Sequence, residues 1–236
     1  MNLIKFEKVT KLLKKREIVH QIDFEINQNE VIALVGTNGA GKTTTIRMLL
    51  GITQPEAGSI TRWASDFNKK IGVQLQSTPF FEGYTVLENL KLFRTFYDAA
   101  LSNQELTGIL ESYNLHDASE TVATNLSLGQ QKRLALAITT LHNPELIILD
   151  EPSAGLDPGG QREVQQMIKQ LKKAGKTILF SSHDMLEVRN IADRVIIMDK
   201  GRILADGAPG KLLAEYQVLD LEELFYLVTA KEKAYV

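Results

Sequence analysis

The chain has 236 residues, of which 44% are hydrophobic and 24% are charged, and its formal net charge is -2. This balance is typical of a globular protein with a sizeable core, and it lacks the basic excess of most nucleic-acid-binding proteins. The sequence contains no cysteine, which excludes disulfide bonds and thiolate metal sites. No apolar run approaches the ~20 residues that span a bilayer, so we expect any work at a membrane to go through a partner.

The N-terminal residues have the pattern of antiparallel strands with one buried face. Ile4 and Phe6 alternate with polar residues, and Ile22, Phe24 and Ile26 do the same. This spacing of two residues places the apolar side chains on one side of a sheet. We therefore predict an N-terminal antiparallel β-subdomain.

Continuous apolar runs recur later and predict strands that are buried on both faces. They are Val31–Val35, Leu146–Leu149, Thr177–Phe180 and Val195–Met198. Helical patterns separate these runs, for example at Val164–Leu171. Strands that alternate with helices indicate a mostly parallel core sheet in an α/β fold.

The stretch 78–143 reads as helices inserted into this strand pattern. Thr85 and Glu88 are spaced as a capping box, which predicts a helix that runs through Phe93. A second apolar helical face ends just before Pro144, a residue that cannot continue a helix. We expect one domain over 1–236, with 78–143 as its inserted α-helical subdomain.

The C-terminal part predicts a hairpin and a helical tail. The turn Asp199-Lys200-Gly201 joins two short apolar runs and suggests a hairpin. In the tail, about 208–236, Leu221, Leu224 and Val228 share one helical face. We expect this face to pack on its own domain rather than on a membrane.

A glycine-rich loop follows the first buried run. Residues Gly36–Thr43 fit the pattern G-x-x-x-x-G-K-[ST] in full. The glycines let backbone N–H groups approach phosphate oxygens, and the helix that follows presents its positive end to the anion. Lys42 adds a charge for the outer phosphates and Thr43 a hydroxyl for Mg²⁺. The loop predicts a nucleotide site but does not separate a kinase from a GTPase or a motor.

The run Leu146–Leu149 ends in two carboxylates, Asp150 and Glu151. Ligands of open α/β sheets bind at the carboxyl ends of strands. Asp150 is placed to hold Mg²⁺, and Glu151 can orient or deprotonate a water molecule. The pair favours hydrolysis over transfer to an acceptor.

A second helix start suited to anions lies at Leu126–Gln130, where Ser127 can cap the helix and Gly129 permits close approach of a phosphate. One nucleotide does not need two such ends from one molecule. Two facing chains would use both, each supplying Ser127 and Gly129 to the ATP of the other. His183 follows the run Thr177–Phe180, so it stands at the end of a predicted parallel strand, next to the expected nucleotide site.

Together these motifs resemble the ATP-binding subunit of ATP-binding cassette (ABC) transporters, a P-loop NTPase fold, over about residues 1–207. Gly36–Thr44 resembles the Walker A motif, Leu126–Gln130 the signature motif, Leu146–Glu151 Walker B and Ser153–Asp157 the D-loop. His183 stands where the family has its switch histidine. Gln76 is the favoured Q-loop glutamine, with Gln74 as the alternative.

The resemblance implies site residues in three groups. The catalytic group comprises Glu151, His183, Lys42 and Gln76. The metal group comprises Thr43, Gln76 and Asp150. The group that binds nucleotide comprises Gly36, Thr37, Asn38, Gly39, Ala40, Gly41, Lys42, Thr43, Thr44, Ser127, Gly129, Gln130 and Asp157.

Two positions depart from the family pattern. Leu128 replaces a glycine of the signature, and Leu13 stands near the place of an aromatic residue that commonly stacks on adenine. Because Ser127 and Gly129 remain, phosphate contact should survive the first change. The second predicts a weaker preference for ATP over GTP.

The resemblance further implies an ATPase that uses ATP and Mg²⁺, forms a homo- or heterodimer and binds a permease on a separate chain at the inner face of the cell membrane, without nucleic acid. The tail Leu221–Phe225 resembles those of drug, antibiotic and peptide exporters, so we expect export. An importer subunit and a soluble cassette ATPase of cluster assembly are the alternatives. The cargo is not encoded here, because its path lies in the membrane subunit.

Overall fold

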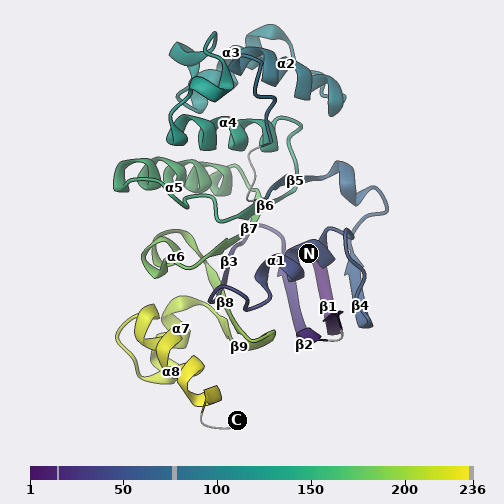
Figure 1. Cartoon of the computed structure of the whole chain (residues 1–236), viewed down its shortest axis with the longest axis vertical. Coiled ribbons are helices and arrows are strands. Elements are labelled where there is room, and N and C mark those ends of the chain that lie inside the picture. Colours follow the sequence, from purple (N-terminus) through teal and green to yellow (C-terminus); the bar gives the residue numbers. More distant parts are fainter. Residues whose placement is uncertain (15, 76–78, 234–236) are drawn as a thin grey trace. The chain divides into compact units, whose positions relative to one another are not determined.

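The computed structural model describes residues 1–14, 16–75 and 79–233 of an α/β protein (Figure 1). The chain forms two compact units. The first combines Met1–Asn68 with Thr177–Val236, and the second is Lys69–Lys176. The short 3-10 turn η1 (Phe67–Lys69) lies where the chain passes from the first unit to the second.

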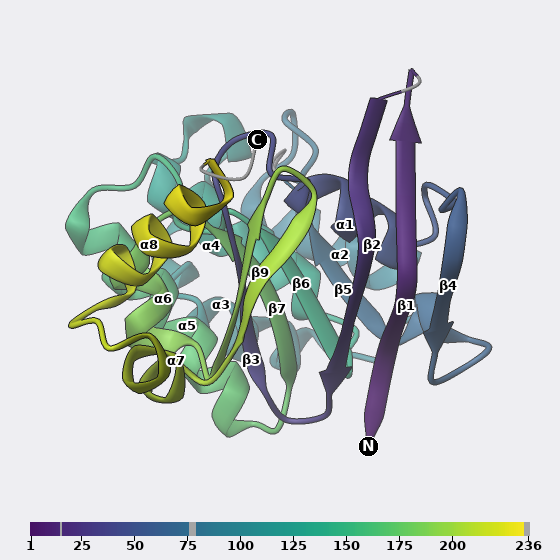
Figure 2. The same cartoon turned by 90° about the horizontal axis from the view of Figure 1, so that it is seen from below.

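An antiparallel sheet forms the N-terminal part of the first unit. Its strand order is β2 (Arg16–Asn27), β1 (Asn2–Leu13) and β4 (Ala57–Arg62), and Figure 2 shows the three strands side by side. Phe6 pairs with Phe24, and their rings stack at 4.3 Å between centroids. The antiparallel β-subdomain predicted from the sequence is thus confirmed, with β4 as an additional strand.

Parallel strands form the other sheet region of this unit. The strand β3 (Val31–Val35) pairs in parallel with β7 (Thr177–Ser182) and with β8 (Arg194–Asp199). All five residues of β3 are buried, as its continuous apolar run predicted. The strand β9 (Arg202–Gly207) pairs with β8 in the predicted hairpin.

The turn of this hairpin has a left-handed backbone at two successive residues. Lys200 has φ 43° and Gly201 has φ 79°. Two positive φ values match the twist that a tight hairpin between right-twisted strands requires. The residues Lys200 and Gly201 therefore determine the conformation of this turn.

The helices of the first unit are α1 (Lys42–Leu49), α6 (Met185–Ile191), α7 (Pro209–Tyr216) and α8 (Leu221–Lys233). In Figure 2, α6, α7 and α8 lie together beside β9. Leu221, Leu224 and Val228 of α8 are buried, which confirms that the tail packs on its own unit. Among the described residues, no helix has the length and apolar character needed to cross a membrane.

In the second unit, the described residues form two parallel strands and four α-helices. The strands are β5 (Ile71–Gln74) and β6 (Leu146–Asp150). The helices are α2 (Val86–Phe96), α3 (Asn103–Ser112), α4 (Leu128–Thr140) and α5 (Pro158–Lys173), with the short turns η2 (His116–Ala118) and η3 (Ala123–Asn125). Figure 1 shows α2, α3 and α4 grouped together.

Side-chain caps fix where these helices begin. Thr85 and Glu88 form the predicted capping box of α2, and Ser127 forms another with Gln130 at α4. The helix α2 continues one turn beyond the predicted end at Phe93, because Phe93 and Phe96 share an aromatic cluster that stabilises the last turn.

Candidate functional site

The glycine-rich loop of the first unit is closed over its own lysine. The Nζ atom of Lys42 donates to the carbonyl oxygens of Gly36 at 2.7 Å and of Thr37 at 3.2 Å. The lysine side chain is buried, with 6% of its surface exposed. Gly39 and Gly41 have φ values of 83° and 106°, which glycine adopts without strain. The backbone therefore turns tightly around a buried positive charge.

The helix α1 begins directly after this turn. Gly41 is its N-cap residue and has no side chain that could bond the first N–H groups of the helix. Such N–H groups and the positive end of the helix dipole attract a phosphate group. The loop and α1 together therefore form an anion-binding cradle.

The hairpin β8–β9 supports this cradle from below. The N–H group of Gly201 donates to the carbonyl oxygen of Ala40 at 2.9 Å, and the Thr37 hydroxyl donates to Asp199 at 3.3 Å. A Cβ atom on Gly36 would lie 2.4 Å from the carbonyl oxygen of Met198. The loop is thus held by residues about 160 positions away, which no local sequence pattern indicates.

A cavity of about 410 Å³ opens at one side of the loop. It is lined by Gly36, Thr37, His183, Asp184, Met185, Glu222, Phe225 and Tyr226. His183 follows β7 and is exposed, so the structure brings this predicted residue to the same cavity as the start of the loop. The sequence does not predict that residues of α8 line this cavity, because their spacing indicates only a helix packed on its own domain.

The predicted carboxylate pair ends β6 in the second unit. Asp150 is the last residue of the strand, with 1% of its surface exposed. Glu151 has φ 53°, a left-handed conformation that is uncommon for a residue with a Cβ atom. The backbone thus bends at the second carboxylate, directly after the strand. This arrangement allows one carboxylate to hold a metal ion while the other acts on water.

The predicted second anion site lies at the start of α4. The N–H group of Gln130 donates to the Ser127 hydroxyl oxygen at 3.3 Å, while the Ser127 N–H group donates to the Gln130 side chain at 2.9 Å. A Cβ atom on Gly129 would meet nothing within 4 Å, so the backbone there is open to a ligand. A hydroxyl group that accepts one hydrogen bond can still donate one. The Ser127 side chain can therefore cap its helix and contact an anion.

The signature residues and the D-loop share a second cavity, of about 470 Å³. Its lining includes Ser127, Gly129, Gly155, Asp157 and Gly160. Asp157 caps α5, because its Oδ1 atom accepts from the N–H group of Gly160 at 2.7 Å.

Leu128, the departure from the family pattern, is 45% exposed and lies over Gly155, with its Cδ2 atom 3.3 Å from where a Cβ would stand. Its side chain contacts the D-loop and lines the same cavity as Ser127 and Gly129. No local sequence pattern indicates this contact between the two motifs.

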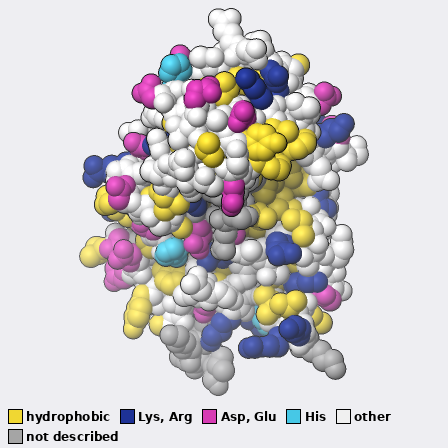
Figure 3. Space-filling model, turned by 45° about the horizontal axis from the view of Figure 1, so that its top comes forward, with side chains coloured by type: hydrophobic (Ala, Val, Ile, Leu, Met, Phe, Trp, Pro, Cys, Tyr) yellow, Lys and Arg dark blue, Asp and Glu magenta, His cyan; other side chains and the backbone are white. Residues whose placement is uncertain are grey.

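Exposed aromatic residues gather at α2 and the loop before it. Phe81, Tyr84, Phe93, Phe96 and Tyr97 form a chain of ring contacts with centroids 5.8 to 6.1 Å apart. We call these five residues the aromatic face. Four of its members are at least 36% exposed, with Phe96 at 61%. Figure 3, in which the top of Figure 1 is turned toward the viewer, shows a patch of hydrophobic side chains.

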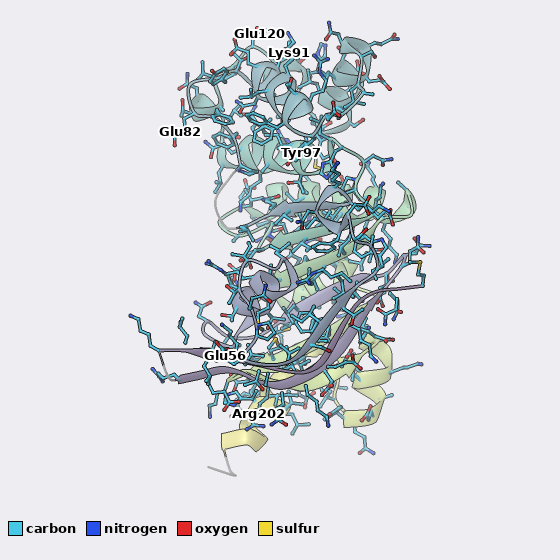
Figure 4. All side chains as sticks on the ribbon, turned by 90° about the vertical axis from the view of Figure 1, so that its right-hand side faces the viewer. Glu56, Glu82, Lys91, Tyr97, Glu120 and Arg202 are labelled. Carbon is cyan, nitrogen blue, oxygen red and sulfur yellow. The ribbon has the colours of Figure 1, made fainter. Side chains whose placement is uncertain are left out.

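Buried polar contacts hold the aromatic face in shape. Asn89 is fully buried and accepts from the Phe81 N–H group at 2.7 Å, while its Nδ2 atom donates to the carbonyl oxygens of Phe81 and Tyr84. Tyr97, labelled in Figure 4, packs against His142 with 4.2 Å between ring centroids and 34° between the ring planes. Burial raises the pKa of Tyr97 and lowers the pKa of His142, so both rings stay neutral at physiological pH.

Three further residues were named from the sequence. Gln76, the favoured Q-loop glutamine, lies outside the described residues. Gln74, the alternative, ends β5 and is buried, with 1% of its surface exposed. Leu13 is 59% exposed at the end of β1.

Comparison with known proteins identifies the group to which this arrangement belongs. A sequence profile described as "ABC transporter" matches residues 19–154, more than half of the chain. The chain belongs to the ABC transporter family. A structure titled "Structure of ATP binding subunit of ABC transporter" matches with a TM-score of 0.84 and 25% identity, covering 96% of this chain and 99% of that one.

Curated relatives of this ABC protein carry the name "Nod factor export ATP-binding protein I". One from Paraburkholderia xenovorans (strain LB400) is 35% identical over 231 residues, which is 94% of this chain and 76% of the relative. One from Cupriavidus metallidurans is 32% identical over 232 residues, covering 94% and 77%. A structure of cbiO1 from Clostridium perfringens, titled as part of the transporter complex cbiONQ, matches with a TM-score of 0.80 and 27% identity over 97% of this chain and 99% of that one.

The family membership confirms several predictions from the sequence. The protein is an ATP-binding subunit of the ABC type and belongs to a class of ATP-hydrolysing enzymes. Its α/β fold, with mostly parallel strands and an antiparallel β-subdomain, is that of ABC cassettes.

The contact between the loop and the hairpin predicts the effect of a small substitution. In Gly36→Ala the new methyl group would collide with the Met198 carbonyl oxygen, and the loop would have to move away from β8. We expect the Kd for ATP to rise more than about tenfold, measured by titration calorimetry. Gly83→Ala is the matched control, since a Cβ there meets nothing within 4 Å. Equal ATP affinity of both variants and the wild type would contradict a hairpin-supported cradle.

Proposed function

We propose that this ABC subunit hydrolyses ATP to power export by a separate membrane subunit, with a drug, an antibiotic or a peptide as the class of cargo. The observation that carries the hydrolysis is the complete set of motif residues in the chain, above all the carboxylate pair Asp150 and Glu151 at the end of β6. The export direction is supported by relatives whose names describe an export ATP-binding protein. The cell-membrane location, on its inner face, follows from the same proposal.

The first unit would bind the phosphates of ATP. Lys42 already occupies the centre of the loop, where its Nζ atom contacts the carbonyl oxygens of Gly36 and Thr37. A charged lysine exchanges such neutral acceptors for phosphate oxygens at a gain, because charge-assisted hydrogen bonds are stronger. The uncapped first turn of α1 adds N–H groups to the same phosphates. Positive charge is thus fixed before the transition state forms, so no reorganisation is needed.

The second unit would supply the group that activates water. We assign Glu151 as the general base, which accepts the proton of the attacking water as the bond to the γ-phosphate forms. His183 would hold the γ-phosphate and the attacking water in line. Its exposed position at the cavity beside Gly36 supports this role.

Two motif residues, each taken within its own unit, offer oxygen donors for a magnesium ion. Thr43 offers a hydroxyl and Asp150 a carboxylate that is 99% buried, since 1% of its surface is exposed. Oxygen donors of these two kinds are those that Mg²⁺ prefers, together with phosphate oxygens. A buried carboxylate is stabilised by a cation, which favours Asp150 as the metal-holding member of the pair. When bound, the ion would neutralise charge on the β- and γ-phosphates.

The cavity at Ser127 and Gly129 supports a dimer. In one chain this second anion-binding end has no nucleotide of its own to serve. We propose that two subunits face each other and that Ser127, Gly129, Gln130 and Asp157 act on the ATP of the partner. Isologous pairing of this kind uses the same surface on both subunits and closes on itself.

The aromatic face supports a membrane partner. Exposed contiguous apolar patches on soluble domains mark interaction sites. Rings that are held rigidly, as here by Asn89, lose little conformational entropy when a partner binds. We propose that the permease inserts a short cytoplasmic helix against Phe81, Tyr84 and Phe96. The glutamate Glu82 between them would favour a basic residue on that helix.

The base assignment predicts the behaviour of Glu151→Gln. Without a carboxylate the attacking water keeps its proton, so we expect ATP turnover to fall by at least about a hundredfold. ATP affinity should change less than threefold, because binding depends on the loop at Lys42. Phosphate release measures the first and titration calorimetry the second. Glu111→Gln on α3 is the control. Near-normal turnover in Glu151→Gln would remove this role from the residue.

The shared site predicts a gain of activity on mixing two inactive variants. Lys42→Ala destroys the loop and Ser127→Arg blocks the second anion end, so each homodimer is inactive. A mixed dimer retains one intact site, formed by the loop of one chain and Ser127 of the other. With random pairing we expect up to about a quarter of the wild-type ATPase rate. If dimers form and no activity returns, ATP is not shared between subunits.

The docking role of the aromatic face predicts a loss of partner binding without a loss of chemistry. Phe96→Glu places a charge in the apolar face, so co-purification of a polytopic membrane protein from detergent extracts should fall at least about tenfold. The ATPase rate of the isolated subunit should stay within twofold. Leu219→Glu, at a site that is 92% exposed, is the control. Recovery of a soluble partner instead would favour the cluster-assembly alternative.

A further inference from the structure

Lys132 is a buried charge that the ATP site described above does not use. It lies in the second turn of α4, and 6% of its surface is exposed. Burial of an ammonium group is costly unless an acceptor compensates it. The position therefore calls for a specific acceptor.

One such acceptor is the backbone carbonyl group of Glu151. The Nζ atom of Lys132 is 3.5 Å from the carbonyl oxygen of Glu151, in the same unit. At this length the contact is mainly the attraction between a charge and a carbonyl dipole. Glu151 has φ 53°, a conformation that residues with a Cβ adopt at an energetic cost and that persists only when neighbours enforce it. Lys132 supplies such a neighbour.

We propose that Lys132 is a positioning residue for Glu151. Its ammonium group holds the Glu151 carbonyl oxygen, which fixes the left-handed backbone at this residue and so the direction of the Glu151 side chain. In this proposal the lysine acts through the Glu151 backbone and not on the substrate itself. This inference rests on the proposed role of Glu151 as the general base.

The helix that carries Lys132 begins at the cap residue of the proposed second anion site. The helix begins at the cap residue Ser127, which faces the nucleotide of the partner in the proposed dimer, and Lys132 is five positions further along. An α-helix is stiff over so short a distance. Lys132 and the cap residue Ser127 therefore belong to one stiff segment of the chain.

The test is Lys132→Met, which keeps the length and the apolar stem of the side chain but removes the charge. We expect kcat to fall about tenfold while KM and the Kd for ATP stay within about twofold. The melting temperature should stay the same or rise, because a buried charge is replaced by an apolar group of similar volume. Lys169→Met, an exposed lysine on α5, is the matched control and should be silent in all four measurements.

A conservative variant and a second background separate positioning from mere anchoring of the helix. Lys132→Arg keeps a cation near the carbonyl oxygen and should recover part of the lost kcat. In a Glu151→Gln background, Lys132→Met should lower the residual single-turnover rate no further, because the group through which it acts is already gone.

Three results would overturn the inference. The first is a wild-type kcat in Lys132→Met. The second is a fall in kcat accompanied by weaker ATP binding and a lower melting temperature. The third is an equal loss of rate in the wild-type and Glu151→Gln backgrounds. If Glu151→Gln alone keeps its turnover, the base assignment fails together with this inference, whereas a silent Lys132→Met beside an inactive Glu151→Gln refutes the inference alone.

Discussion

The first N–H groups of a helix have no hydrogen-bond acceptor within the helix itself. The candidate site depends on how this constraint is met. Side chains meet this need at α2, α3, α4 and α5, through Thr85, Ser102, Ser127 and Asp157. The helix α1 begins instead at Gly41, which has no side chain to offer. In the proposed site a phosphate group takes the place of a side-chain cap, and the buried Lys42 adds charge at the same point. The remaining parts of the first unit hold this arrangement in place.

The sequence predicted most of the elements because their signals are local. A buried strand at Val31–Val35 and a capping box at Thr85 and Glu88 can be read from neighbouring residues alone. The strand β4 was missed, since none of its residues is fully buried and no alternation of apolar residues appears in Ala57–Arg62. Its place is set by pairing with β1, which is a long-range contact. Local patterns do not contain such information.

The same distinction applies to the candidate site. The motif residues Lys42, Ser127 and His183 were found because each motif has a fixed spacing. What supports them was not found, because it comes from distant segments: the Gly201 N–H group under the loop, Tyr226 of α8 in the cavity with His183, and Lys132 beneath Glu151. From the sequence alone, Lys132 is one more charge on a polar helix. Its burial in the structure indicates that its charge makes a specific contact.

Ser127 carries a consequence for how the protein can evolve. Its oxygen atom both accepts the Gln130 N–H group and stands at the cavity that contains Gly129. Alanine would lose the cap, at a cost of about 1 kcal/mol, as well as the proposed contact with an anion. Asparagine would restore a cap but place an amide group where a hydroxyl is needed. One oxygen atom thus serves both the stability of the helix and the proposed ligand contact. A substitution at this position therefore changes both properties together.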